Sequence, residues 1–268
     1  AITTCGRKIL MFRFLLLFLM TFSANVFAEN VKPTSNQVDE FTDIERRIVE
    51  LSGLLSLSEQ VKSSAQHMIA LSTIKAGASQ GDASNMDATN EYEIVEINHA
   101  QHFGIAQSLA KRWGQDEWEK RLLVIVASID NKAQKKIEKD LSQKRLRSAQ
   151  KKEKAAISIQ TEAEYRLYMN KLKQRPPAAS RWKLVEALDN KSGFSQLIIK
   201  TREQVYQEIS SQVKDWQPPA NWQQEAKQEV LEFLFYAYRK TPNPELKKIA
   251  NSYTPALQSF FTKVKAGL

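Results

Sequence analysis

Two histidines and a carboxylate recur at helical spacing in the middle of the chain. Glu96, His99 and His102 lie three residues apart from one another, so on one α-helix they would lie near a common face. Imidazole nitrogen and carboxylate oxygen are ordinary ligands of Zn²⁺. The three residues therefore predict a metal site, for which the sequence names no fourth ligand. The alternative is an exposed helix face whose histidines are solvated or hydrogen-bonded.

A second candidate site is a run of basic side chains in residues 132–154. This segment holds ten Lys and Arg residues against three acids, a formal charge of +7. Its apolar stripe is narrow, so contact with an anionic surface is expected without deep insertion. The alternative is a solvated helical arm that keeps the protein soluble. The side chains expected to bind anionic lipid or lipopolysaccharide are Lys135, Lys136, Lys139, Lys144, Arg145, Arg147, Lys151 and Lys152.

Motifs for other kinds of chemistry do not occur in the sequence. There is no Gly-x-Ser-x-Gly elbow and no phosphate-binding glycine loop. The single cysteine, Cys5, precedes the expected mature chain, so we expect no disulfide and no thiolate nucleophile. We therefore expect a protein without catalytic activity and without a cofactor. A metal-dependent envelope enzyme that uses Glu96, His99 and His102 is the alternative.

Residues 11–28 have the composition of a secretory signal peptide. Arg13 is a short basic region, residues 14–22 are an apolar run, and Val26 and Ala28 are small residues at the cleavage positions. The run of nine residues is shorter than the roughly 20 that span a bilayer. We therefore expect cleavage and a periplasmic location in a Gram-negative envelope, without a transmembrane anchor in the mature chain.

Residues 1–10 precede Met11, and we expect them to result from a start codon assigned too far upstream. Removing residues 1–28 leaves 240 residues, enough for a substantial core, and lowers the formal net charge from +9 to +6. Because residues 132–154 alone carry +7, the rest of the expected mature chain is close to neutral. In an exported protein such a local patch favours envelope proteins or anionic lipid as partners, and we expect no nucleic acid.

Scarce glycine, prolines between segments and apolar residues at helical spacing predict an all-α fold. A Gly/Ser/Asn/Asp-rich loop is expected at residues 77–90. The expected helices begin near residue 43, with an interruption at 52–53, and continue over 92–113, 116–129, the basic segment, 161–173, 180–190, 194–213, 222–238, 245–253 and 255–266.

Two pairs of short motifs indicate a tandem duplication. The first pair is Ser52-Gly53-Leu54 and Ser192-Gly193-Phe194; the second is Ser128-Ile129 with Gln134 and Ser252-Tyr253 with Gln258. Unrelated amphipathic helices would also align by their spacing. We expect a helical bundle of two tandem, divergent repeats, residues 29–175 with the basic arm 132–154, and residues 176–268.

Three segments resemble secreted bacterial helical proteins that carry domain of unknown function 2059. They are IVELSGLLSLSEQV (48–61), LVEALDNKSGFSQLI (184–198) and NPELKKIANSYTPALQSFF (243–261). Thr254-Pro255-Ala256 stands where that family commonly has Ser-Pro-Ala, and Leu257 stands where glycine is usual. The resemblance implies a helical fold and export. It implies no catalytic residues, because the family has no established activity.

Together these patterns predict an exported, non-catalytic helical protein that binds or scaffolds in the bacterial envelope. The aromatic residues of the second half are expected mainly in the core. An alternative for some of them is a groove between the two repeats that accepts a peptide helix or a lipid chain.

Overall fold

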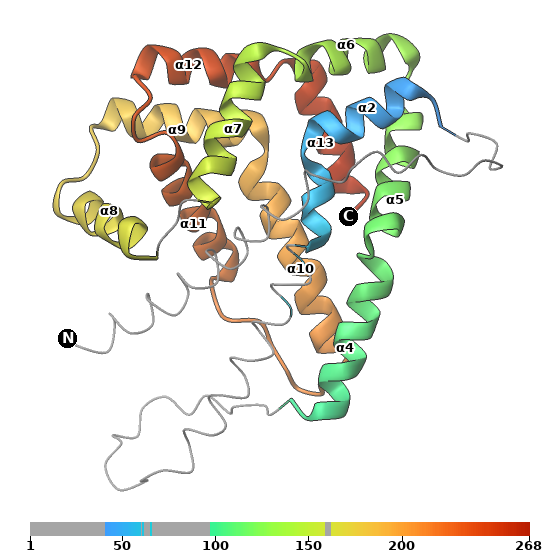
Figure 1. Cartoon of the computed structure of the whole chain (residues 1–268). Helices are drawn as coiled ribbons and strands as arrows, with labels where there is room; N and C mark the ends of the chain where they lie inside the picture. The colour runs from blue at the N-terminus through green and yellow to red at the C-terminus, as the bar shows by residue number, and fades with distance from the viewer. Residues whose placement is uncertain (1–40, 60, 62–64, 66–96, 159–161) are drawn as a thin grey trace, which may run out of the picture.

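The computed structural model describes residues 41–59, 61, 65, 97–158 and 162–268, and within this part of the chain it is all helical (Figure 1). The predicted all-α fold is therefore confirmed. The expected leader (1–10 and 11–28) and the loop at 77–90 lie outside the described residues, as does Glu96. The elements are α2 (Asp43–Ser52), the 3₁₀ turn η2 (Leu54–Ser56), α4 (His99–Arg112), α5 (Gln115–Ala127), α6 (Asn131–Leu141), α7 (Lys144–Ser158), α8 (Glu162–Gln174), α9 (Ala179–Ser192), α10 (Phe194–Gln212), α11 (Trp222–Ala237), α12 (Asn243–Ser252) and α13 (Pro255–Ala266).

Local capping explains where several helices begin. Thr42 and Glu45 form a capping box at the start of α2, in which each side chain accepts a hydrogen bond from the other residue's backbone N–H. Asn98 and Gln101 form the same box at α4, so this helix begins at His99 and Ile97 and Asn98 lie outside it. The sequence predicts a single helix over 92–113, whereas in the structure the described part of this helix begins at His99, because Asn98 is its N-cap.

Two helix breaks have the same hydrogen bonds. At the end of α2 the Ser52 hydroxyl donates to the carbonyl of Val49 and accepts from the backbone N–H of Leu54, and at the end of α9 the Ser192 hydroxyl makes the equivalent bonds with Asp189 and Phe194. Gly53 and Gly193 follow with φ of 74° and 68°. A left-handed residue after a helix is typical of a C-terminal cap, where glycine carries no Cβ penalty.

Alanine at either glycine is expected to lower the free energy of unfolding by about 1 kcal/mol, because the left-handed backbone is unfavourable for a residue with a Cβ. No atom lies within 4 Å of a Cβ added at Gly53 or Gly193, so the cost is conformational and not steric. Urea unfolding of Gly53→Ala and Gly193→Ala measures it. Asparagine, which tolerates the left-handed region, should lose less at both sites; equal losses for Ala and Asn would contradict this explanation.

A second pair of breaks joins α5 to α6 and α12 to α13. Gln134 donates to the carbonyl of Ile129, and Gln258 donates to the carbonyl of Tyr253, five residues back in each case. In both places the next residue in the chain, Asp130 or Thr254, is the N-cap of the following helix. The Asp130 side chain accepts a hydrogen bond from the backbone N–H of Ala133, and the Thr254 side chain accepts one from the backbone N–H of Leu257. Both motif pairs that the sequence singles out thus have matching local geometry.

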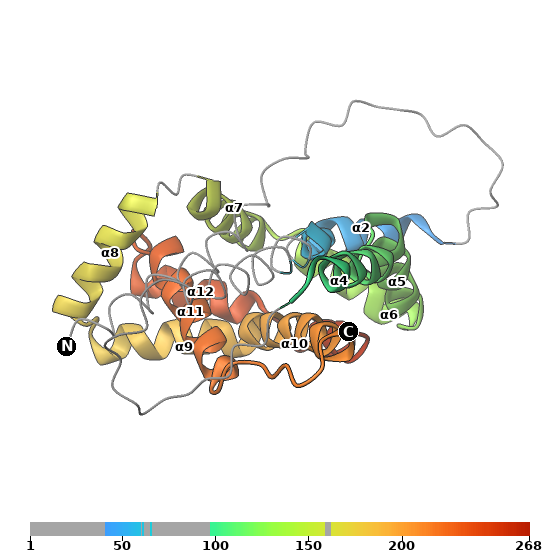
Figure 2. The same ribbon diagram turned by 90° about the horizontal axis from the view of Figure 1, so that it is seen from below.

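The helices enclose two hydrophobic clusters, and α10 contributes buried residues to both. In Figure 2, α2, α4, α5 and α6 lie on the right and α8, α9, α11 and α12 lie toward the left. The first contains buried residues of α2, α4, α5, α6, α13 and most of α10. Trp118 is fully buried there, and its indole N–H donates to the carbonyl of Leu54 at 2.8 Å. The second contains buried residues of α7, α8, α9, α11 and α12. The division between the clusters does not follow the order of the chain, since α10 and α13 join helices that lie more than 50 residues before them.

Within the described residues, no helix has both the length and the apolar character needed to cross a membrane.

Candidate functional site

The structure places two of the three predicted metal ligands. His99 is the exposed first residue of α4, and His102 is half-buried one turn later. Burial and the neighbouring His99 lower the pKa of His102 below its ordinary value, which favours the neutral imidazole that a metal requires. Glu96 lies outside the described residues. Among those that are described, no group of three or more His, Cys, Asp or Glu side chains has a metal-binding arrangement.

The basic segment forms two helices, and not the single protruding arm expected from the sequence. α6 ends at Leu141 and α7 begins at Lys144, because Ser142 and Gln143 turn the chain between them. Both helices are part of the fold: α6 packs against α2 and α13, and α7 packs against α11 and α12. The reason is that Ile137, Leu141 and Leu146 are buried in the first cluster, so the narrow apolar stripe is sufficient to dock the segment.

The outer face of α6 carries four lysines in one stripe. Lys132, Lys135, Lys136 and Lys139 follow the i, i+3, i+4, i+7 pattern and are all exposed. Among the residues that the structure describes, none of the four forms an ion pair. Like charges at i, i+4 destabilise a helix by a few tenths of a kcal/mol per pair. The like-charge pairs 132/136 and 135/139 therefore work against the helix, and of the four only Lys139, in the last turn of α6, is favourably placed for the helix dipole.

The predicted basic residues of α7 have divided roles. Lys144 and Lys151 are exposed and form no ion pair within the described part of the chain. Arg147 donates to the carbonyl of Leu51 and to Gln150, and the Lys152 ammonium donates to the Thr241 hydroxyl at 3.0 Å. Arg147 and Lys152 thus connect α7 to neighbouring segments. The four lysines of α6, Lys144 and Lys151 form no ion pair among the described residues.

Nearby carboxylates do not neutralise the lysines. Glu138 of α6 pairs with Arg47 at 3.0 Å, and Glu245 of α12 lies 3.8 Å from Arg145. Asp140 is buried and accepts hydrogen bonds from Thr254 at 2.6 Å and from Gln143. These acids therefore join helices to one another, and the positive charge of the outer face remains uncompensated.

Sequence reasoning missed two lysines that belong to the same surface. α12 buries Leu246, Ile249 and Ala250 and exposes Lys247 and Lys248 on the opposite side. They lie about 100 residues after α6 in the chain, but α12 packs against α7, and α12 and α6 lie along the same edge of the molecule, at the top of Figure 1. In the sequence, the only signal was two adjacent lysines next to the apolar stripe of a helix. Such pairs occur on many helix surfaces, so this one indicates a binding surface only once the fold places it near α6.

A carboxyl group inside the fold was counted from the sequence as part of the surface charge. Glu153 of α7 accepts a hydrogen bond of 2.6 Å from the hydroxyl of Tyr238. Burial raises the pKa of Glu153 to about 7, although the bond from Tyr238 acts in the opposite direction. Nearby, burial and the charge of Glu153 both raise the pKa of Tyr253. This cluster joins α7 to the ends of α11 and α12.

An apolar pocket of about 350 Å³ lies between α8, α9 and α11. Its walls include Met169, Leu172, Pro177 and the rings of Trp182 and Phe235, whose centroids are 4.5 Å apart. Lys173 and Glu232 lie beside these apolar groups and carry opposite charges, so the pocket favours neither positively nor negatively charged ligands.

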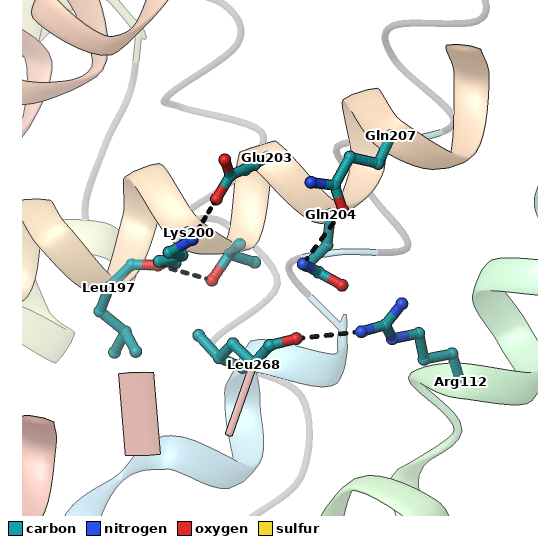
Figure 3. Close-up of polar contacts among 8 residues, drawn as sticks. Arg112, Leu197, Lys200, Glu203, Gln204, Gln207 and Leu268 are labelled. Atoms are coloured by element: carbon teal, nitrogen blue, oxygen red, sulfur yellow. Dashed lines mark hydrogen bonds and ion pairs between the residues drawn. The ribbon is translucent and has the colours of Figure 1, made fainter. Parts of the chain in front are cut away.

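A second hollow, of about 490 Å³, lies at the elbow between α4 and α5 and contains three cations, Lys111, Arg112 and Arg121. Arg112 donates to the carbonyl of Leu268 at 3.0 Å (Figure 3), and Arg121 donates to the carbonyl of Gly267 at 2.8 Å. The Arg121 guanidinium also lies over the rings of Trp113 and Trp118. Both arginines therefore hold the end of α13 against the elbow, as expected for cations at a helix C-terminus.

No protein-family model, curated protein or solved structure matches the chain. The resemblance to domain of unknown function 2059 therefore stays a prediction from the sequence.

Proposed function

We propose that this protein is a non-catalytic binding protein that attaches to an anionic surface through the exposed lysines of α6. The observation that carries the proposal is the stripe of Lys132, Lys135, Lys136 and Lys139, which faces solvent with no carboxylate paired to it among the described residues. Each such lysine contributes about 1 kcal/mol to binding near an anionic lipid surface.

The proposed setting is the bacterial envelope. The signal-peptide composition of residues 11–28 supports export into the periplasm, where anionic lipid and lipopolysaccharide supply phosphate groups. Envelope proteins with acidic surfaces are further partners of the same kind.

We also propose that the chain arose by tandem duplication. In support, α2, α5 and α6 correspond to α9, α12 and α13 in order, and both pairs of breaks between them share their hydrogen bonds. α2 packs against α5 and α6, as α9 packs against α12 and α13. A crystal structure in which these two sets of helices superpose in order and direction would support the duplication, and opposite directions would refute it.

Reversal of the four α6 lysines tests the proposed function. The Lys132→Glu, Lys135→Glu, Lys136→Glu, Lys139→Glu variant of the mature chain is expected to bind phosphatidylglycerol-containing vesicles about 1,000-fold more weakly, because neutralisation alone removes about 4 kcal/mol. Cosedimentation at low salt measures the affinity. Raising the ionic strength from about 0.05 to 0.5 M should release the unmodified protein.

The matched control reverses four exposed lysines of other helices. Lys111, Lys120, Lys227 and Lys263 lie on α4, α5, α11 and α13, and their substitution by Glu gives the same net charge. The control should retain most of the binding. Equal losses in both variants would show that net charge alone drives adsorption, and would refute a specific role for α6.

A further inference from the structure

The lysines of α6 are part of a larger surface, built by three helices from distant parts of the chain. We call it the basic edge: the four lysines of the α6 stripe, Lys144 at the start of α7, and Lys247 and Lys248 of α12. α7 packs against both α6 and α12, and Arg145 of α7 lies beside Glu245 of α12. The three helices are therefore fixed relative to one another.

The six lysines of α6 and α12 project from the same side of the fold. α6 lies on α2 and α13, α12 lies on α9, and these supporting helices are all below α6 and α12 in Figure 1. The buried faces of α6 and α12 point toward those supports. Their exposed lysines consequently point away from the body of the molecule along one edge.

The charge of this edge works against stability. Lys144, Arg145 and Arg147 occupy the first turn of α7, which contains no acid. Cations at a helix N-terminus are unfavourable because they add to the positive end of the helix dipole. Arg145 and Arg147 have partners within the fold, Glu245 and the carbonyl of Leu51. Lys144 and the four lysines of α6 form no ion pair among the described residues, and a negatively charged partner would explain them.

The basic edge also lacks the apolar side chains that insert into a bilayer. The large apolar residues with high exposure in the described part of the chain are Phe103, Val124 and Leu167. They belong to α4, α5 and α8, and none lies on α6, α12 or the start of α7. A partner bound here is therefore held by charge and not by burial of apolar surface.

We infer that the basic edge is a docking face for a flat array of phosphate groups, the headgroup surface of an anionic bilayer, which α6 and α12 contact at the same time. This inference rests on the proposed function and adds to it the second helix and the planar partner. A phosphate array of this kind suits a rigid row of lysines on separate helices, since each ammonium group can interact with a nearby headgroup phosphate without a binding pocket.

Substitution of the α12 lysines tests the inference. Lys247→Gln with Lys248→Gln should weaken binding to phosphatidylglycerol-containing vesicles about 30-fold, from two lysines at about 1 kcal/mol each. Lys111→Gln with Lys227→Gln, which removes the same charge from α4 and α11, should leave the affinity unchanged. Unfolding curves that match the unmodified protein establish that each variant is folded.

The outcomes separate the inference from the proposed function. If the α6 variant loses binding and the α12 variant does not, the basic edge is refuted and the proposed function stands. If the α6 variant binds normally, both are refuted. Loss in both variants, with normal binding by the two controls, supports both.

Two further measurements identify the partner. A single-stranded DNA oligonucleotide that binds as tightly as the vesicles at the same salt would refute the bilayer, and we expect weaker binding. Inorganic phosphate should displace the protein only by raising the ionic strength, as sodium chloride does; displacement at a low concentration would refute a flat array and indicate a discrete phosphate site.

Discussion

Replacement of Arg202 by alanine is expected to lower the free energy of unfolding by about 3–5 kcal/mol, because it leaves a buried carboxylate without its partner. Arg202 of α10 is 3% exposed, and its guanidinium lies 2.5 Å from the carboxylate of Glu229 on α11, whose side chain is 12% exposed. Burial raises the pKa of Glu229 above its ordinary value despite the attraction of Arg202. The pair is therefore buried, so that removing Arg202 leaves the charge of Glu229 without a partner and lowers the free energy of unfolding.

A double variant separates the pair from its parts. Arg202→Met with Glu229→Leu removes both charges and keeps the volume close to the original, so it should lose much less stability than Arg202→Ala. The single variant should also lose less near pH 5 than at pH 8, because protonation of Glu229 removes the isolated charge. Urea unfolding at the two pH values measures both effects. A double variant as unstable as the single one would show that Arg202 acts through packing alone.

Elements with their own local signals could be predicted from the sequence. The helices from α9 to α13 begin and end within two residues of the expected positions, because proline, glycine and capping residues mark these boundaries. The Ser-Gly breaks were also recognisable, since the hydrogen bonds that form them join residues two or three positions apart.

Properties that depend on contacts between distant segments could not be predicted. The narrow apolar stripe of α6 predicts a surface contact without deep insertion or a solvated arm, but Ile137 and Leu141 are buried because α2 and α13 cover them. Lys247 and Lys248 join the basic edge only because α7 packs against both α6 and α12. Arg202 and Glu153 look like surface charges in the sequence, and their burial depends on helices that follow them in the chain.

Glu153 is expected to make the protein more stable in mild acid than at neutral pH. Its pKa is about 7 in the folded protein, against an ordinary value of 4.5. Below pH 4.5 the carboxyl group is protonated in both states and has no effect. Between pH 4.5 and 7 the unfolded chain loses this proton while the folded protein keeps it, so the free energy of unfolding falls as the pH rises.

Substitution by glutamine should therefore stabilise the protein at pH 8. Glu153→Gln keeps an oxygen that accepts the hydrogen bond from Tyr238 and removes the charge that burial disfavours. We expect a gain of roughly 2–3 kcal/mol in the free energy of unfolding at pH 8, and little or no gain at pH 4.5. Residual exposure of Glu153 places the gain toward the lower end, because water screens part of the charge.

The measurement is urea unfolding of both proteins at pH 4.5, 6 and 8, with Glu117→Gln on the exposed surface of α5 as the control. Only Glu153→Gln should flatten the pH dependence. Equal curves for Glu153→Gln and the unmodified protein at all three pH values would show that the carboxylate is as well solvated as on the surface. Lys144 of the basic edge and Glu153 lie on the same helix, α7. A Glu153→Gln variant that is more stable but binds vesicles unchanged would show that the contact between Glu153 and Tyr238 affects the stability of the fold. It would also show that attachment depends on the exposed lysines and not on Glu153.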